Sequence, residues 1–184
     1  GAAIDAALPD LARLRIDVFR AFPYLYEGNL IYEQHYLRSY RDTPGAVLVA
    51  ARDGGRIIGA ATGMPLMDHA DATQITDRAF DTDGVFYCAE SVLLPEYRGH
   101  GLGHVFFDHR EAHARSLGFA KSAFCAVIRP QDHPQRPADY RPLDPFWRKR
   151  GYAPVPNLTA QFNWTDVGDT EETAKTLQVW MKSL

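Results

Sequence analysis

The fold of this chain is decided by one stretch, which reads Glu90-Ser-Val-Leu-Leu-Pro95-Glu-Tyr-Arg98-Gly99-His-Gly101-Leu-Gly103-His-Val-Phe-Phe107. It opens with an apolar run that Pro95 stops, which is typical of a buried strand that ends there. The three glycines that follow let the backbone turn tightly and point several N–H groups toward one place.

A helix is expected to begin inside this glycine turn. Apolar and histidine side chains recur at helical spacing after it, at Leu102, Val105, Phe106, His109, Ala112 and His113. The first N–H groups of a helix have no partner within it, and the helix dipole adds about half a positive charge at that end. The turn is therefore expected to bind a phosphate group.

Two known phosphate-binding patterns do not fit the turn. A dinucleotide fingerprint requires Gly-x-Gly-x-x-Gly, whereas Gly99, Gly101 and Gly103 have a different spacing and no acidic residue follows on a later strand. A Walker loop requires a lysine after its glycines, and none follows here. An ordinary strand-turn-helix, in which the glycines serve only the turn, is the structural alternative.

The pattern that does fit is Arg-x-x-Gly-x-Gly, present as Arg98-Gly-His-Gly101-Leu-Gly103. With the strand before it, the helix after it, and Phe146-Trp-Arg-Lys-Arg-Gly-Tyr152 further on, it resembles the acyl-CoA motif of the GCN5-related N-acetyltransferase (GNAT) superfamily. The resemblance implies an α/β fold with a mixed, mostly antiparallel sheet that is split at its centre and flanked by helices.

Composition excludes several classes of protein. The chain has 184 residues, of which 46% are hydrophobic and 23% charged, as in a soluble globular protein. Its net charge of −3 argues against nucleic-acid binding, and no apolar run approaches the roughly 20 residues that span a membrane. Since no signal peptide is visible, the expected location is the cytoplasm. Cys88 and Cys125 lie in strand-like runs and are expected to be buried free thiols.

No repeat or linker divides the chain, so residues 1–184 are expected to form a single domain. The patterns predict a helix over Pro9–Phe22 and a second helix capped by Asn29. The further elements are strands at 46–52 and 56–65 joined by a Gly-Gly turn, a strand at 85–94, a helix at 101–118, a strand at 122–128, a helix at 146–150, a strand at 158–164 and a helix at 170–182 capped by Asp169.

Two segments are harder to interpret. Between the first two helices, Tyr24, Tyr26 and Glu27 either line a substrate mouth or pack the helices together. Residues 66–83 show no firm pattern and form either a lid over the acceptor site or a loop without a function.

The chain also departs from the superfamily at three points. The expected first strand is represented only by Ala3-Ile4-Asp5, and the connection at 129–141 is longer than usual. The predicted final helix stands where many relatives end in a hairpin.

The resemblance implies that acetyl-CoA is the co-substrate and that its pyrophosphate binds the turn, mainly through backbone N–H groups. The residues assigned to this role are Arg98, Gly99, His100, Gly101, Leu102, Gly103 and His104. In relatives the pantetheine arm pairs with the central strand, which corresponds here to Ser91, Val92 and Leu93. An N–H group of that strand could also stabilise the developing oxyanion.

The acceptor amine must lose a proton before it attacks. An amine with the pKa of lysine, about 10.4, is neutral in only about one molecule in 2500 at pH 7, which costs about 4.6 kcal/mol. Glu90 is the candidate general base, because relatives often carry a carboxylate at this point of the central strand. The alternative is a Glu90 that faces solvent or forms a salt bridge.

The general acid is left open. Relatives commonly use a tyrosine in the short helix before the Gly-Tyr pair, but Trp147 stands there, and an indole does not release its proton at neutral pH. Tyr140, Tyr152 and Tyr87 are the candidates to replace it, or water protonates the thiolate. Trp147 is then expected to pack against the pantetheine arm.

Two sets of basic side chains are candidates for binding a ligand. The histidines at 100, 104, 109 and 113 have a spacing that can hold a metal, but no acidic ligand completes the set, so they are interpreted as surface residues and no metal is expected. Arg129, Arg136 and Arg141 are interpreted as a solvated loop, with the CoA 3′-phosphate or an anionic acceptor as alternative partners.

The sequence thus predicts an N-acetyltransferase that moves acetyl from acetyl-CoA to the primary amine of a small molecule by direct attack. One alternative is a non-catalytic acyl-CoA-binding or sensing module, which Trp147 favours. Another is acetylation of a protein N-terminus or lysine. The expected partner is a small-molecule amine, with no nucleic acid and no membrane, and a homodimer is left open.

Overall fold

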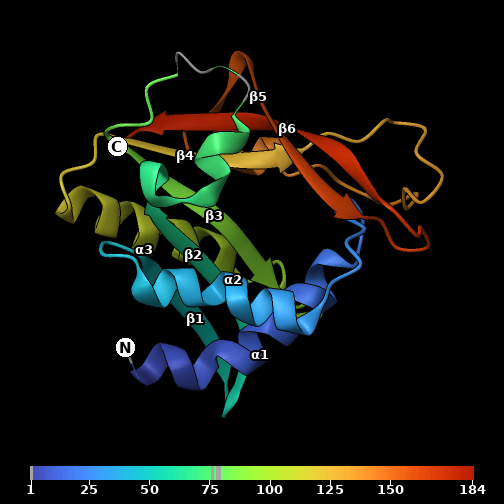
Figure 1. Ribbon diagram of the computed structural model, residues 1–184, viewed down its shortest axis with the longest axis horizontal. Helices are drawn as coiled ribbons and strands as arrows, with labels where there is room; N and C mark the ends of the chain where they lie inside the picture. Colours follow the sequence, from blue (N-terminus) through green and yellow to red (C-terminus); the bar gives the residue numbers. More distant parts are fainter. Residues whose placement is uncertain (1, 76, 78–79) are drawn as a thin grey trace.

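The computed structural model describes residues 2–75, 77 and 80–184. They form a six-stranded sheet in the order β1-β2-β3-β4-β6-β5, with α1 and α2 on one face and α3 on the other (Figure 1). The strands are β1 Val47–Asp53, β2 Arg56–Pro65, β3 Val85–Leu93, β4 Lys121–Val127, β5 Ala153–Thr165 and β6 Glu172–Ser183. The helices are α1 Ala2–Phe19, α2 Leu30–Asp42, α3 Leu102–Ser116 and α4 Asp144–Lys149, with 3-10 turns η1 Leu66–Asp68, η2 Ala70–Gln74 and η3 Pro95–Tyr97.

The sheet opens between β3 and β4. These parallel strands pair only at Val85–Lys121, Phe86–Ser122 and Tyr87–Ala123. Beyond the last of these pairs, β3 continues to Leu93 and β4 to Val127 with no further pairing between them. The other neighbouring strands are antiparallel. The prediction of a mixed, mostly antiparallel sheet split at its centre is confirmed.

The N-terminal helices form mostly as expected. The side chain of Asn29 accepts hydrogen bonds from the N–H groups of Ile31 (3.0 Å) and Tyr32 (3.1 Å), so the predicted cap of α2 is confirmed. The first helix, however, is α1, and it runs through Ala3-Ile4-Asp5. The expectation of a first strand there was wrong, because the alanines of this segment are strong helix formers and simply extend the helix.

The hairpin of β1 and β2 packs tightly against its neighbours. A side-chain carbon added at Gly59 would lie 2.7 Å from Leu93 Cδ1, and one at Gly63 would lie 2.5 Å from the ring of Phe86. These approaches are too close for any side chain, which explains the glycines of β2.

The C-terminal segment is a strand. The predicted helix at 170–182, with Asp169 as its cap, was wrong: residues Glu172–Ser183 form β6, which lies between β4 and β5. Lys175, Leu177 and Val179 alternate in burial with their neighbours, which is the period of a strand. Two antiparallel partners hold this strand, and they outweigh the weak helical propensity of the segment. The chain therefore ends in a hairpin, β5–β6.

The connection from β2 to β3 carries η1 and η2 and passes over the sheet. Residues 76 and 78–79, which belong to the segment predicted as a lid or a loop, lie outside the described residues. Cys88 and Cys125 are buried free thiols, as predicted. Among the described helices, none is long and apolar enough to cross a lipid bilayer.

Candidate active site

The glycine turn between β3 and α3 is open. Gly99 and Gly101 have φ angles of +83° and +84°, a left-handed conformation that favours glycine. A side-chain carbon added at either residue would meet no atom within 4 Å. Gly103 differs, because a side-chain carbon there would lie 3.3 Å from Phe146 of α4. The turn is therefore not filled by side chains, and a ligand can approach its backbone.

The turn also presents free hydrogen-bond donors. Gly101 is the cap of α3, and its carbonyl accepts from the N–H of His104 (2.9 Å), whereas the first-turn N–H groups of Leu102 and Gly103 have no partner within the helix. Among the residues that the structure describes, no acceptor is bonded to the N–H groups of Gly99, His100 or Gly101. Arg98 lies beside them, where its Nε donates to the carbonyl of Leu93 (3.2 Å) and anchors the guanidinium. Donors, dipole and charge at this place suit a pyrophosphate.

The strand that leads into the turn has a free edge. Ser91, Val92 and Leu93 pair with Ala61, Ala60 and Gly59 of β2 on one side, and on the other side they lie beyond the last pair with β4. Arg110 of α3 fixes the strand from behind: it donates to the carbonyls of Thr62 and Glu90 and to the hydroxyl of Ser91. This free edge is where a pantetheine arm can pair with the strand.

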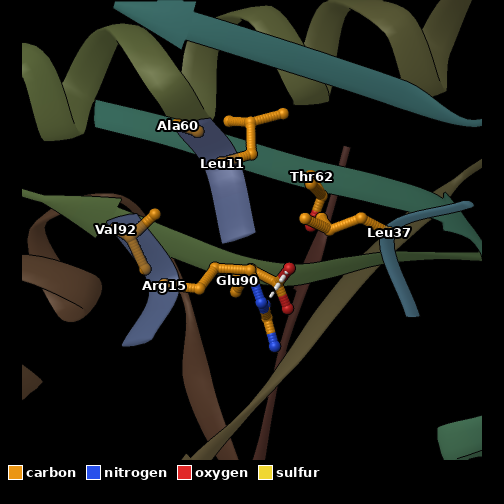
Figure 2. Close-up of a pocket in the computed structure, with 7 residues that line it drawn as sticks. All are labelled: Leu11, Arg15, Leu37, Ala60, Thr62, Glu90 and Val92. Carbon is orange, nitrogen blue, oxygen red and sulfur yellow. Dashed lines mark ion pairs between the residues drawn. The ribbon is translucent and has the colours of Figure 1, made fainter. Parts of the chain in front are cut away.

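Glu90 lies on β3 directly after an irregularity. Thr62 pairs with Glu90 and Met64 with Tyr87, so two residues of β3 stand opposite Gly63 alone. This is a β-bulge, which commonly re-aims the side chain that follows it. The side chain of Glu90 points toward α1 and α2, where it forms an ion pair with Arg15 (Figure 2). Its other oxygen accepts a hydrogen bond from Tyr36 (3.0 Å).

Arg15 contacts a second carboxylate. Its Nε donates to Glu33, whose other oxygen accepts from the hydroxyl of Tyr26 (2.8 Å). Arg15 also lies over the ring of Tyr36 at 4.4 Å. Burial by itself lowers the pKa of Arg15, but the charge of Glu90, followed by Tyr36 and Glu33, outweighs it and holds the pKa well above its ordinary value. Arg15 is therefore a permanent buried cation between two carboxylates.

Two tyrosines and a histidine continue this cluster. The hydroxyls of Tyr36 and Tyr40 are 2.9 Å apart, and Nε2 of His69 lies 2.9 Å from the hydroxyl of Tyr40. Nδ1 of His69 accepts from the N–H of Asp71 (3.0 Å), so the ring proton of a neutral His69 is on Nε2, facing the tyrosines. Burial, followed by the charge of Glu90, raises the pKa of Tyr36 and of Tyr40 well above 10.

A small cavity adjoins the ion pair. The centre of a water molecule can move within about 10 Å³ of it, so the cavity has room for about one water molecule. Its lining residues are Leu11, Arg15, Leu37, Ala60, Thr62, Glu90 and Val92 (Figure 2).

The predicted acid Tyr152 lies away from Glu90. Its ring packs against Phe107 of α3 and Phe124 of β4, and its hydroxyl lies 2.9 Å from that of Ser122 and 3.3 Å from Glu111. Burial raises its pKa well above 10. Tyr152 thus belongs to the core on the α3 face of the sheet, whereas Glu90 points toward α1 and α2.

The other aromatic candidates are spread around the split. Tyr140 packs edge-on against Phe22, with ring centroids 4.7 Å apart, and burial raises its pKa. Tyr87 donates to Asp71 (3.0 Å). Trp147 packs against Phe124 and Trp180 at 5.0 and 5.2 Å. The structure therefore brings none of these three side chains into hydrogen-bond contact with Glu90.

The basic residues have mostly structural partners. Arg129 binds both oxygens of Asp166 (2.7 and 2.8 Å) and donates to the carbonyls of Pro23 and Tyr24, so its guanidinium is already occupied. Nε2 of His113 lies 3.0 Å from the carbonyl of Gly45. Within the described part of the chain, no group of three or more histidine, cysteine or acidic side chains is placed to hold a metal ion.

Sequence reasoning missed Arg15, Glu33 and His69 as members of the site. The signal was present for the first two, since Arg15 stands on the apolar stripe of α1 and Glu33 precedes Leu37 by one helical turn. Opposite charges on two apolar helix faces indicate a buried ion pair. Nothing in the sequence pointed to His69, because its segment has no regular pattern.

The sequence of the chain matches a known protein family. A family model described as the acetyltransferase (GNAT) family matches residues 10–137. No curated protein sequence gives a significant match.

Solved structures resemble nearly the whole chain. The ribosomal-protein-alanine N-acetyltransferase of Brucella melitensis is 17% identical, with a TM-score of 0.63 over 98% of this chain and 96% of that one. A GCN5-related N-acetyltransferase of Kribbella flavida is 18% identical, with a TM-score of 0.63 over 98% and 94%. The PaiA N-acetyltransferase of Thermoplasma acidophilum, in complex with coenzyme A, is 11% identical, with a TM-score of 0.57 over 98% and 94%. At these identities the likeness concerns the fold alone.

Proposed function

The chain belongs to the acetyltransferase (GNAT) family, and from this premise we propose that it is an N-acetyltransferase that moves acetyl from acetyl-CoA to the primary amine of a small molecule. One observation carries the proposal: the open glycine turn stands at the end of β3, the strand that separates from β4. A pyrophosphate on the turn and a pantetheine arm along the free edge of β3 fit these two features together.

The residues of the turn fit acetyl-CoA. The empty space in front of Gly99 and Gly101, and the donors of the α3 N-terminus, suit a pyrophosphate. Arg98 adds charge, while His100 and Leu102 contribute through their backbone N–H groups; the N–H of His104, also assigned to the phosphate, already donates to the carbonyl of Gly101 (2.9 Å). Ser91, Val92 and Leu93 offer the strand edge, and Trp147 packs against Phe124 of β4, the strand on the other side of the split.

Glu90 is the group that we assign as the base. Oε2 of Glu90 accepts a hydrogen bond from Tyr36, whereas Oε1 forms an ion pair with Arg15 and has no hydrogen-bond partner among the described residues, so both oxygens retain lone pairs that can take up a proton. The ammonium form of the acceptor gives one proton to Glu90, the neutral nitrogen bonds to the thioester carbon, the carbon–sulfur bond breaks, and the second proton of the nitrogen is passed on to the thiolate, which leaves as CoA thiol. For that last proton Tyr140 is the better placed of the assigned tyrosines, because the hydroxyl of Tyr152 is engaged with Ser122 and Glu111.

A small-molecule acceptor is supported by the enclosure around Glu90. Tyr24 packs against Phe19 (4.7 Å) and Trp164 (6.1 Å), and the hydroxyl of Tyr26 is bound to Glu33. Burial, followed by the charges of Cys125, Glu90 and Tyr140, raises the pKa of Tyr24. Partly buried aromatic side chains on the side of Arg15 and Glu33 favour a compact amine over an extended peptide.

The decisive experiment measures binding and turnover separately. Binding of CoA is measured by calorimetry, and release of free thiol from acetyl-CoA is followed with a panel of small amines, a lysine peptide and a peptide with a free N-terminus. We expect micromolar CoA binding and amine-dependent thiol release that is fastest with small amines. Gly101→Val should abolish CoA binding, because its side chain enters the open space of the turn, and should also lower the unfolding temperature, because valine is strained at a φ of +84°.

Each other outcome has a clear meaning. Binding of CoA without any amine-dependent turnover would identify a sensing module instead of an enzyme. Turnover only with peptides would identify a protein acetyltransferase. Unchanged CoA affinity in Gly101→Val would overturn the assignment of the phosphate site.

A further inference from the structure

Arg15 and Glu33 form one unit with Glu90, and we propose that they are positioning residues that hold Glu90 in place and set how readily it takes up a proton. The inference rests on the proposed function, because it assumes that Glu90 is the base. It is carried by geometry: one guanidinium lies between two carboxylates, each on a different element of the fold. α1 supplies the cation, α2 supplies Glu33, and β3 supplies Glu90.

All three side chains are shielded from water. The side chains of Arg15, Glu33 and Glu90 are 10%, 0% and 9% exposed. In such a place charges interact far more strongly than on the surface, because water does not screen them. One positive and two negative charges leave one negative charge in excess. Arg15 is therefore shared between Glu33 and Glu90 and does not serve Glu90 alone.

The orientation of Arg15 is fixed independently of Glu90. Its Nε is bound to Glu33, and its guanidinium lies over the rings of Tyr36 (4.4 Å) and Phe19 (5.2 Å). Glu33 is itself held by the hydroxyl of Tyr26 (2.8 Å). Glu90 can therefore gain or lose a proton while Arg15 stays in place.

Groups from every element around Glu90 contribute to its environment. They are Arg15 of α1, Tyr24 of the connection to α2, Glu33, Tyr36 and Tyr40 of α2, and His69 of the segment after β2. Asp71 lies one step further away, bound to His69. Among these groups, Arg15 forms an ion pair with Glu90, and Glu33 is the carboxylate that forms an ion pair with Arg15. They are therefore the residues whose charge should decide proton uptake.

Two charge-removing variants make opposite predictions. Glu33→Gln keeps the shape of the side chain and removes a negative charge, so Arg15 acts on Glu90 alone. The titration midpoint of the Glu90 carboxyl should then move down by about one pH unit. Arg15→Met leaves two carboxylates facing each other without the cation, and the midpoint should move up by about one pH unit or more.

The first readout needs no turnover. The protein is labelled with ¹³C at glutamate carboxyl carbons, and the signal of Glu90 is assigned by its loss in Glu90→Gln. Its titration is compared in the wild type, Glu33→Gln, Arg15→Met and Arg15→Lys, with unfolding temperatures measured in parallel. Arg15→Lys keeps the positive charge, so the titration midpoint of Glu90 in this variant should lie close to that of the wild type and below that of Arg15→Met. Asp5→Asn is the matched control, since it breaks an exposed ion pair that also joins α1 to α2 and should leave the midpoint unchanged.

The second readout is the acidic limb of the kcat/KM profile, which reports the base of the free enzyme. It should move in the same directions as the NMR midpoint. If Arg15→Met does not fold, the titration midpoint of Glu90 in Glu33→Gln alone tests the inference. Midpoints that stay within about 0.2 units of wild type in Glu33→Gln, or that move the same way in Glu33→Gln and Arg15→Met, would overturn the inference. If the midpoints move as expected but no amine is acetylated, the inference about the three charges stands and the proposed function fails.

Discussion

The glycine turn at residues 98–104 follows the C-terminal end of β3, and the cluster of Arg15, Glu33 and Glu90 meets the same strand at Glu90, but the two present different atoms to a ligand. The turn offers backbone N–H groups from a single continuous segment, and its side-chain space is empty. The cluster offers side chains from α1, α2 and β3, and hardly any of its surface is exposed.

The difference has a physical origin. A phosphate is bound well by several aligned N–H groups, which any residue can supply provided that the backbone can turn. Proton transfer needs one side chain whose pKa suits the reaction, and the pKa of a side chain depends on the groups buried beside it. Substitutions should therefore act through backbone conformation in the turn and through charge in the cluster.

The largest effect is expected at Glu90. Replacing it by Gln removes the proton acceptor and should lower kcat by about 10²- to 10⁴-fold, which is the usual contribution of a general base. The affinity for CoA should stay unchanged, because the turn does not depend on this side chain. Steady-state kinetics and calorimetry measure the two quantities. Glu171→Gln, which removes an exposed carboxylate, is the control, and full activity in Glu90→Gln would exclude Glu90 as the base.

A structural cluster of the same kind should affect stability instead of catalysis. Arg129 and Lys175 both lie against Asp166, so Asp166→Asn leaves two buried cations without their carboxylate. We expect a loss of about 3 kcal/mol in the free energy of unfolding at pH 7, measured by urea denaturation. Asp10→Asn, in an exposed pair with Arg13, should cost less than about 0.5 kcal/mol.

The pH dependence of this loss has a definite sign. Burial alone raises the pKa of Asp166, but the hydrogen bonds and charge of Arg129, with the charge of Lys175, outweigh it and hold the pKa below its ordinary value. The stabilisation is therefore complete above about pH 4 and is lost as the pH falls through the lowered pKa. The wild type and Asp166→Asn should converge in stability at acidic pH. A difference that stays constant down to pH 2 would show that the effect is not electrostatic.

In the turn, the charged side chain should matter less than the backbone. Arg98→Ala should weaken CoA binding by about tenfold, the value of one charge-assisted contact. The loss should shrink as salt is raised, because Arg98 is exposed and its charge is screened. Calorimetry at low and high salt measures it, with Arg115→Ala at the far end of α3 as a control that should bind normally.

The smallest effect is expected at His100. Its side chain is exposed, and only its backbone N–H is assigned to the phosphate. His100→Ala should change the affinity for CoA by less than about threefold. A loss above tenfold would mean that the imidazole itself contacts the ligand, and the contrast between turn and cluster would fail for this residue.

The strand, the turn and α3 could be predicted from the sequence because each is encoded locally. Pro95 ends the apolar run, and Gly99 and Gly101 supply the left-handed conformations of the turn. The N-cap Asn29 was recognised for the same reason. The two wrong elements lie near the ends of the chain: Ala3-Ile4-Asp5 joined α1, and the segment after Asp169 became β6. In the second case the partners β4 and β5, which are distant in the sequence, outweighed a local pattern.

The sequence by itself determined the glycine turn between β3 and α3, because glycine spacing and the start of a helix act within a few residues of each other. It also singled out Glu90 by its place on the central strand. Tertiary structure alone decided what surrounds that carboxylate. Arg15 and Glu33 come from separate helices, and whether their charges meet Glu90 depends on how those helices pack on the sheet. The affinity of a buried group for a proton is a property of that packing, since the neighbouring charges act through space and not along the chain.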